Sequence, residues 1–155
     1  MRYTIIDCYT DEPAGLGVPP YLGTYPRYIF GKLSLQGHEV SYLTIDDLRF
    51  LYTNKQNNKQ TNIRIYNLTK KNTAKILSSA QVLIVICGAH VPGKYLSALP
   101  GPLHEIIPLI SRLRCRKILT GPAASEFGTQ LEGGRSAEKA NLDAFDEIIP
   151  DYVHE

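Results

Sequence analysis

The hydrophobic positions of the chain form short apolar runs that alternate with longer stretches of helical periodicity. The apolar runs predict β-strands at residues 3–8, 39–44, 82–87, 117–120 and 145–149. The third run, Val-Leu-Ile-Val-Ile-Cys, is apolar throughout and rich in β-branched residues. Such a run is typical of a central parallel strand whose two faces are both covered.

The stretches between these runs predict helices. The first helix begins at Thr24, a good N-cap, and ends near Gly37, which suits the position just after a helix. Further helices are expected from Asp46, over residues 69–79, and from Leu103 onward. The apolar face of the first helix is expected to comprise Tyr25, Tyr28, Ile29 and Leu33.

Strands that alternate with helices indicate an α/β fold with a parallel sheet and right-handed crossovers. The number of strands favours a flavodoxin-like or Rossmann-like three-layer sandwich, with a five-stranded parallel sheet in the order 2-1-3-4-5. In that order the connections reverse direction between the first and third strands. Ligands of such folds bind in the crevice at this point.

Three long loops rich in Gly and Pro follow the first, third and fourth predicted strands, at residues 9–23, 88–102 and 121–135. All three therefore belong to the carboxyl edge of the sheet. Long loops on a rigid scaffold are often functional. This asymmetry predicts a binding site at that edge, with the loop after the first strand as one wall.

The chain is long enough for a single domain, residues 1–155, with its own core. The last predicted strand is followed by residues 151–155, where a doubly wound domain normally adds a fifth helix. Residues 136–142 could provide that cover instead. We favour the interpretation that the chain is the N-terminal piece of a longer protein.

Composition excludes several classes of protein. The net charge of +2 is too small to indicate nucleic-acid binding, and no run of about 18 apolar residues exists to cross a membrane. The N-terminus does not resemble a signal peptide, so the cytoplasm is the expected compartment. The three cysteines, Cys8, Cys87 and Cys115, are widely spaced and predict neither a disulfide framework nor a paired metal-ligand motif.

Two functions of this fold order are excluded by single positions. A phosphorelay receiver needs an aspartate at the end of the third strand, where this chain has Cys87. A dinucleotide fingerprint must follow the first strand directly, whereas Gly15-Leu16-Gly17 lies far along the loop. An enzyme that acts alone is not indicated either, because the sequence has no nucleophile–base pair and no carboxylate pair at useful spacing.

A few residues near the predicted crevice allow two interpretations. Cys8, Cys87 and His90 could form a thiol-rich or soft-metal site, but two small buried side chains are the commoner outcome. His90 is the best polar candidate for ligand contact, and a plain hydrogen-bonding role is the alternative. A cluster of basic residues lies at the end of the predicted helix that begins at Leu103. Cations are favourable at the end of a helix, so we prefer this role to an anion-binding or RNA-binding patch. The cluster comprises Arg112, Arg114, Arg116 and Lys117.

Several motifs together resemble a known family. They are Pro-Pro-Tyr-Leu-Gly at 19–23, Tyr-Ile-Phe-Gly-Lys-Leu at 28–33 and Gly-His-Glu-Val at 37–40. This combination resembles the opening of the cobalamin-binding-type domain that precedes many radical S-adenosylmethionine enzymes. With the stretches 12–21 and 90–95, it looks like an archaeal subgroup of those iron–sulfur proteins.

The resemblance implies a Rossmann-like module stacked on a downstream barrel of the same chain. That barrel would carry the iron–sulfur cluster and S-adenosylmethionine, because the motif Cys-x-x-x-Cys-x-x-Cys is absent from these residues. The expected function is a non-catalytic module that covers the active site and binds cobalamin or an unknown substrate. The alternative is a stand-alone docking or small-ligand domain without catalytic activity.

The resemblance also implies positions that would contact the cofactor. Tyr9 stands where classical cobalamin domains have the histidine that ligates cobalt, and many radical enzymes of this family bind the cofactor without that ligand. No protein ligand to a metal is therefore expected here. The implied cofactor-binding residues are Cys8, Tyr9, Pro19, Pro20, Gly88, Ala89, His90, Thr120, Gly121 and Pro122.

Overall fold

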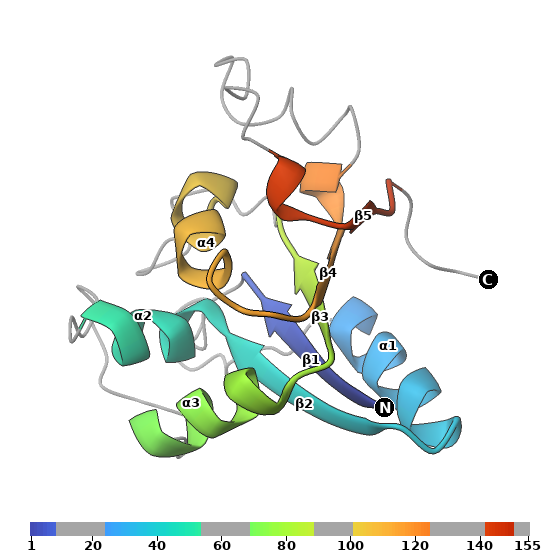
Figure 1. Ribbon diagram of the computed structural model, residues 1–155. Helices are drawn as coiled ribbons and strands as arrows, with labels where there is room; N and C mark the ends of the chain where they lie inside the picture. Colours follow the sequence, from blue (N-terminus) through green and yellow to red (C-terminus); the bar gives the residue numbers. More distant parts are fainter. Residues whose placement is uncertain (9–23, 54–68, 89–100, 125–141, 151–155) are drawn as a thin grey trace, which may run out of the picture.

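A computed structural model describes residues 1–8, 24–53, 69–88, 101–124 and 142–150 (Figure 1). These residues form an α/β domain built on one five-stranded sheet, and every strand pairs in parallel with its neighbours. The strand order is β2-β1-β3-β4-β5. The structure therefore confirms the predicted fold class and topology.

The strands closely match the apolar runs, except at the last one. β3 is buried at all of its positions, as its composition predicts for a central strand. β5 is shorter than the predicted strand 145–149. It begins at Glu147, and residues 145 and 146 link it to a short 3-10 helix, η2 (Leu142–Ala144). The strands are β1 (Arg2–Asp7), β2 (Glu39–Thr44), β3 (Val82–Ile86), β4 (Arg116–Thr120) and β5 (Glu147–Ile148).

The helices divide unequally between the two faces of the sheet. The face that carries α2, α3 and α4 buries the larger apolar cluster, and the opposite face carries α1 with a smaller one. In Figure 1, α1 lies on one side of the sheet and the other three helices lie on the other side. The helices are α1 (Thr24–Leu35), α2 (Ile45–Thr53), α3 (Lys70–Ser79), α4 (Leu103–Ile110) and the 3-10 turn η1 (Pro122–Ala124).

Helix α1 ends as its sequence predicts. Gly37 adopts a φ of 79°, and the amide of His38 donates to the carbonyl of Leu33 at 3.1 Å. The Gly37 amide donates to the Ser34 carbonyl at 3.0 Å. These two bonds form a Schellman motif, in which a glycine takes the left-handed conformation at the least steric cost.

Helix α2 follows β2 without a loop, and one half of a capping box holds the junction. The Asp47 carboxylate accepts from the Thr44 amide at 3.0 Å and from its hydroxyl at 3.3 Å. A carboxylate in the first helical turn also opposes the positive end of the helix dipole. The contacts between Thr44 and Asp47 thereby fix the direction in which α2 leaves β2.

Helices α2 and α4 are joined by an ion pair. The guanidinium of Arg49 donates to both carboxylate oxygens of Glu105, from Nε at 2.6 Å and from Nη2 at 2.7 Å. Arg49 is buried, and Asp46 lies 3.7 Å from its Nη1. The bidentate geometry suits a desolvated arginine and fixes the two helices relative to each other.

Among the residues that the structure describes, every helix is too short or too polar to cross a lipid bilayer.

Substitution of Glu105 with Gln should destabilise the domain by about 1–3 kcal/mol, because the buried Arg49 would lose its bidentate carboxylate partner and keep only the more distant Asp46. The matched control is Glu147→Gln, which removes the partner of the exposed Arg116. That surface pair should contribute under about 1 kcal/mol. Urea unfolding of the two variants measures the difference, and equal destabilisation would contradict the role of the buried pair.

Candidate functional site

The candidate site lies where β1 and β3 end side by side, at the reversal of the strand order. The registers place Asp7 of β1 beside both Thr44 of β2 and Ile86 of β3. Ile86 in turn aligns with Thr120 of β4. One row of residues therefore crosses the sheet at its carboxyl edge, and three of its four members are polar.

On the α1 face, this row is connected by hydrogen bonds from two tyrosines. The Tyr42 hydroxyl donates to Oδ2 of Asp7 at 2.8 Å. The Tyr25 hydroxyl, from the first turn of α1, shares a hydrogen bond of 2.7 Å with the hydroxyl of Thr120. Asp7 and Thr120 are both buried. A carboxylate and three hydroxyl groups thus lie at the switch point, on the side toward α1.

On the α4 face, the same edge is closed by the chain itself. The amide of Gly101 donates to the Cys8 carbonyl at 2.7 Å, and the Cys87 thiol donates to the Gly101 carbonyl at 3.4 Å. A Cβ at Gly101 would lie 2.6 Å from a side-chain carbon of Ile45, so any larger residue would have to displace that buried side chain. Gly101 therefore seals the ends of β1 and β3 beneath the start of α4.

Two further glycines hold the ends of β3 and β4 together. Gly88 and Gly121 both have a φ of +91°, which L side chains rarely adopt. A Cβ at Gly88 would lie 2.4 Å from the amide nitrogen of Ala123, and one at Gly121 would lie 2.9 Å from the Cys87 carbonyl oxygen. These glycines serve the packing of the loop ends on each other.

The structure places half of the predicted binding residues. Thr120 joins the polar row, whereas the Cys8 side chain is 1% exposed and belongs to the apolar cluster on the α4 face. Pro122 begins η1, next to Gly121. Tyr9, Pro19, Pro20, Ala89 and His90 lie outside the described residues.

The sequence interpretation missed three of the polar groups, namely Asp7, Tyr25 and Tyr42. Tyr25 was expected only on the apolar face of the first helix, and Tyr42 had no role beyond lying within the second strand. A signal for Asp7 does exist, because it is an acidic residue within the apolar run of the first strand. An ionisable residue that ends a buried strand indicates a functional position more strongly than the loop composition does.

The thiols of Cys8 and Cys87 behave as core groups. Burial raises the pKa of Cys8 well above that of an ordinary thiol, and a hydrogen bond with Cys87 raises it further. A thiol held protonated in this way is a poor metal ligand. In the described part of the chain, no three His, Cys, Asp or Glu side chains gather as a metal site.

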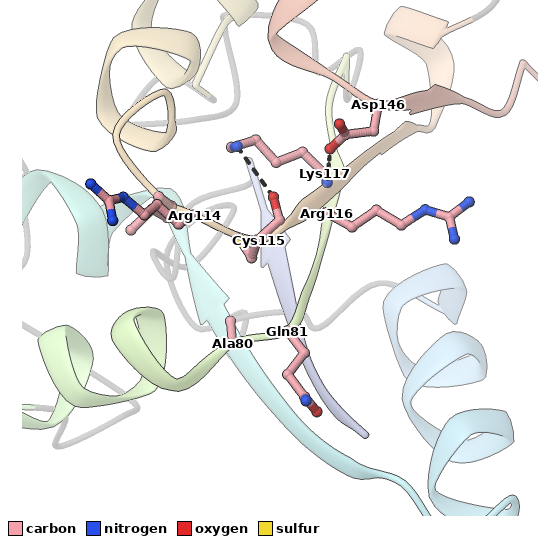
Figure 2. A pocket seen from close by; sticks show the side chains of 8 residues that line it. Ala80, Gln81, Arg114, Cys115, Arg116, Lys117 and Asp146 are labelled. Carbon is pink, nitrogen blue, oxygen red and sulfur yellow. Dashed lines mark hydrogen bonds between the residues drawn. The ribbon is translucent and has the colours of Figure 1, made fainter.

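A broad, open hollow of about 720 Å³ lies at the opposite edge of the sheet, near the starts of β3 and β4. Figure 2 shows the Lys117 ammonium directed at the Cys115 carbonyl, which accepts at 3.3 Å, while Arg114 and Arg116 point in different directions. The basic residues do not converge on a common point. They also follow the last turn of α4 instead of lying within it, so the predicted helix-end role is wrong.

The comparisons with known proteins find archaeal relatives. The chain is 39% identical over 148 residues to an uncharacterized protein of Methanocaldococcus jannaschii, a match that covers 96% of this chain and 24% of that protein. It is 36% identical over 181 residues to an uncharacterized protein of Archaeoglobus fulgidus, covering 99% of this chain and 30% of the relative. The chain thus spans less than a third of either relative. No family model and no solved structure matches it at a significant level.

Replacing Gly88 with Ala should destabilise the domain by at least about 2 kcal/mol, because the new Cβ combines a left-handed backbone with a backbone clash. Gly31 in α1 is the matched control, since a Cβ there meets nothing within 4 Å. Gly31→Ala should stabilise the helix by up to about 1 kcal/mol. Thermal unfolding tests both signs, and a stable Gly88→Ala variant would contradict the proposed packing.

The stability of the domain should fall above about pH 8.5 through Cys8. There the unfolded chain releases the thiol proton while the folded chain retains it, so the free energy of unfolding decreases by up to about 1.4 kcal/mol per pH unit. Urea unfolding from pH 7.5 to 9.5 under reducing conditions should show a shallower slope for Cys8→Ala than for the wild type. Cys115→Ala, at a half-buried thiol, should keep most of the slope. Identical slopes for Cys8→Ala and the wild type would contradict this assignment.

Proposed function

We propose that this domain is a non-catalytic, Rossmann-like binding module at the N-terminal end of a longer archaeal iron–sulfur protein of the radical S-adenosylmethionine type. The module would bind a cobalamin-type cofactor or the substrate at the carboxyl edge of its sheet. It would cover the active site of a downstream catalytic domain. The observation that carries the binding part is the polar row at the β1–β3 switch point.

The position of that row supports ligand binding by a general rule of parallel sheets. Crevices at the carboxyl ends of strands, where the strand order reverses, are the usual sites of small ligands in doubly wound folds. Here Gly101 closes the α4 side of the crevice floor, so the polar groups at this edge are the ones that face α1. Asp7, with its hydrogen bond from Tyr42, and Thr120, with its bond to Tyr25, supply polar anchors there.

The described residues are compatible with a corrinoid held by hydrogen bonds and without a protein ligand to cobalt. The oxygen donors at the switch point are hard ligands that suit cobalt poorly, and the softer Cys8 and Cys87 thiols are buried on the opposite face. Hydroxyl and carboxylate groups can instead hydrogen-bond to the amide side chains around a corrin ring. When bound, the cofactor would supply organometallic or radical chemistry to the catalytic domain.

The length of the relatives supports the modular part of the proposal. In both of them the matched region is less than a third of the protein, which leaves room for a catalytic domain elsewhere in the chain. The motifs at 19–23 and 37–40 point to the radical enzyme class for that domain.

A second candidate function is a docking domain without a small ligand. The seal that Gly101 forms over Cys8 and Cys87 favours this alternative, because it fills part of the expected crevice with the chain's own backbone. The two candidates differ in whether the α1 side of the edge takes up a ligand.

Titration of the full natural polypeptide with hydroxocobalamin should give a saturable change in its visible absorption. Thr120→Val, which removes one hydroxyl from the polar row, should weaken binding about 3- to 10-fold, as expected for one hydrogen bond. Thr73→Val is the control, because its buried hydroxyl on α3 has no hydrogen-bond partner in the described structure. That variant should bind within about twofold of the wild type.

Absence of saturable binding by a folded, full-length protein would overturn the cofactor proposal and leave the docking function. Equal losses in the Thr120 and Thr73 variants would show that the effect comes from stability and not from contact with the cofactor.

A further inference from the structure

The α1 face of the sheet is covered over only part of its width. Within the described residues, α1 packs mainly against β2 and β1, and its first turn reaches β4 through the hydrogen bond between Tyr25 and Thr120. β4 and β5 lie farther from the helix than β1 and β3 do, as Figure 1 shows. Ile84 of β3 and Ile118 of β4 turn their side chains toward this face.

A groove of about 270 Å³ lies where α1 leaves the sheet uncovered. Ile84 and Ile118 form its floor, Tyr28 and Leu33 of α1 form one wall, and Ile149, just after β5, lies at the other side. The lining is largely apolar, with Lys32 and Gln36 on the helical wall. We call this feature the α1 groove.

The exposed surface of α1 extends the α1 groove along the helix. Tyr28 is 47% exposed and Leu35 is 91% exposed. Residues seven apart lie on the same side of a helix, two turns from each other. These two large apolar side chains therefore form a stripe beside the groove, with the polar Lys32 between them.

The handedness of the crossovers restricts what can cover this groove from within the sheet. Parallel strands are joined by right-handed connections, and the described helices between β2 and β3 and between β3 and β4, namely α2, α3 and α4, accordingly lie on the α4 face. The described ends of the connection from β4 to β5 also pack on that face, through Ala123 and Ala124 at the start and Leu142 at the end. Apart from the connection from β1 to β2, which carries α1 itself, a covering segment on the α1 face would therefore come from outside the strand-to-strand connections.

We propose that the α1 groove holds an amphipathic helix supplied by the polypeptide that follows β5 in the longer protein. This inference relies on the modular part of the proposed function, that the domain belongs to a longer chain. The continuing chain would pack in the groove between α1 and the part of the sheet formed by β3, β4 and β5. The helix would insert apolar side chains, spaced three and four residues apart, between Tyr28 and Ile149.

The connection at β5 favours a segment of the same chain over other occupants. Ile149 already lines the α1 groove, so the polypeptide leaves the sheet directly beside the site. A tethered helix binds at high effective concentration and needs little affinity of its own. The groove is also slightly below the volume of about 300–1,000 Å³ that is usual for small-molecule pockets. More than two thirds of each relative lies outside the matched region, which provides ample chain.

A photo-crosslinking experiment on the full natural polypeptide tests the occupant. Benzoylphenylalanine replaces Tyr28, a half-exposed position where an aromatic side chain is already present. After irradiation, mass spectrometry should find a cross-link within one molecule, to a peptide that follows residue 155. The control places the same probe at Ser34, an exposed position on the opposite side of α1. That control should yield less than about a tenth of the cross-linked product.

Three results would overturn the proposal: a cross-link between two molecules, a cross-link confined to residues 1–155, or equal yields from the two probe positions. The first would indicate a dimer interface and the second would mean that the domain covers its own groove. The hydroxocobalamin titration is independent of this result, because the polar row and the groove occupant are probed at different residues. A failed titration with a positive cross-link would reject the cofactor and retain the interdomain helix.

Discussion

The right-handed crossover is the constraint on which the rest of this structure depends. The chain moves from β1 outward to β2, returns past β1 to β3, and then continues to β4 and β5. Because every crossover has the same hand, the reversal sends α1 to one face and the later helices to the other. The same reversal opens the crevice between β1 and β3 and leaves part of the α1 face, over β4 and β5, without a helix among the described residues. The candidate site and the α1 groove therefore have one topological origin.

The backbone at the carboxyl edge decides which side of that crevice is accessible. Gly101, Gly88 and Gly121 each bring two chain segments closer than a Cβ would allow. Their contacts are all internal, so glycine at these positions shapes the protein and does not by itself indicate a ligand that approaches the backbone. With Gly101 beneath α4 and the thiols buried there, polar chemistry is confined to the α1 side. Asp7 then becomes the central group of the site, since it ends the strand at the reversal.

The sequence predicted the topology well because burial of parallel strands and helical periodicity are local signals. The all-apolar run of β3, Thr69 at the start of the predicted helix 69–79 and Gly37 just after α1 each mark an element through nearby residues. The polar row could not be predicted in the same way, because the bond between Tyr25 and Thr120 joins residues 95 positions apart. Local patterns identify Tyr25 as apolar and cannot show where its hydroxyl lies. The contact of Gly101 with Cys8 is nonlocal for the same reason.

Tyr28 shows how a difference between pattern and structure can locate an interface. Its spacing with Ile29 and Leu33 assigns it to the buried face of α1, yet it is 47% exposed. Propensity and packing usually agree in natural sequences, and conflicts concentrate where a surface has a partner. The apolar face of α1 is wider than the part of the sheet it covers, and Leu35 widens it further. The apolar face of α1 is thus larger than its contacts within the described domain require. A second helix that packs beside α1, against Ile84 and Ile118, would account for the excess.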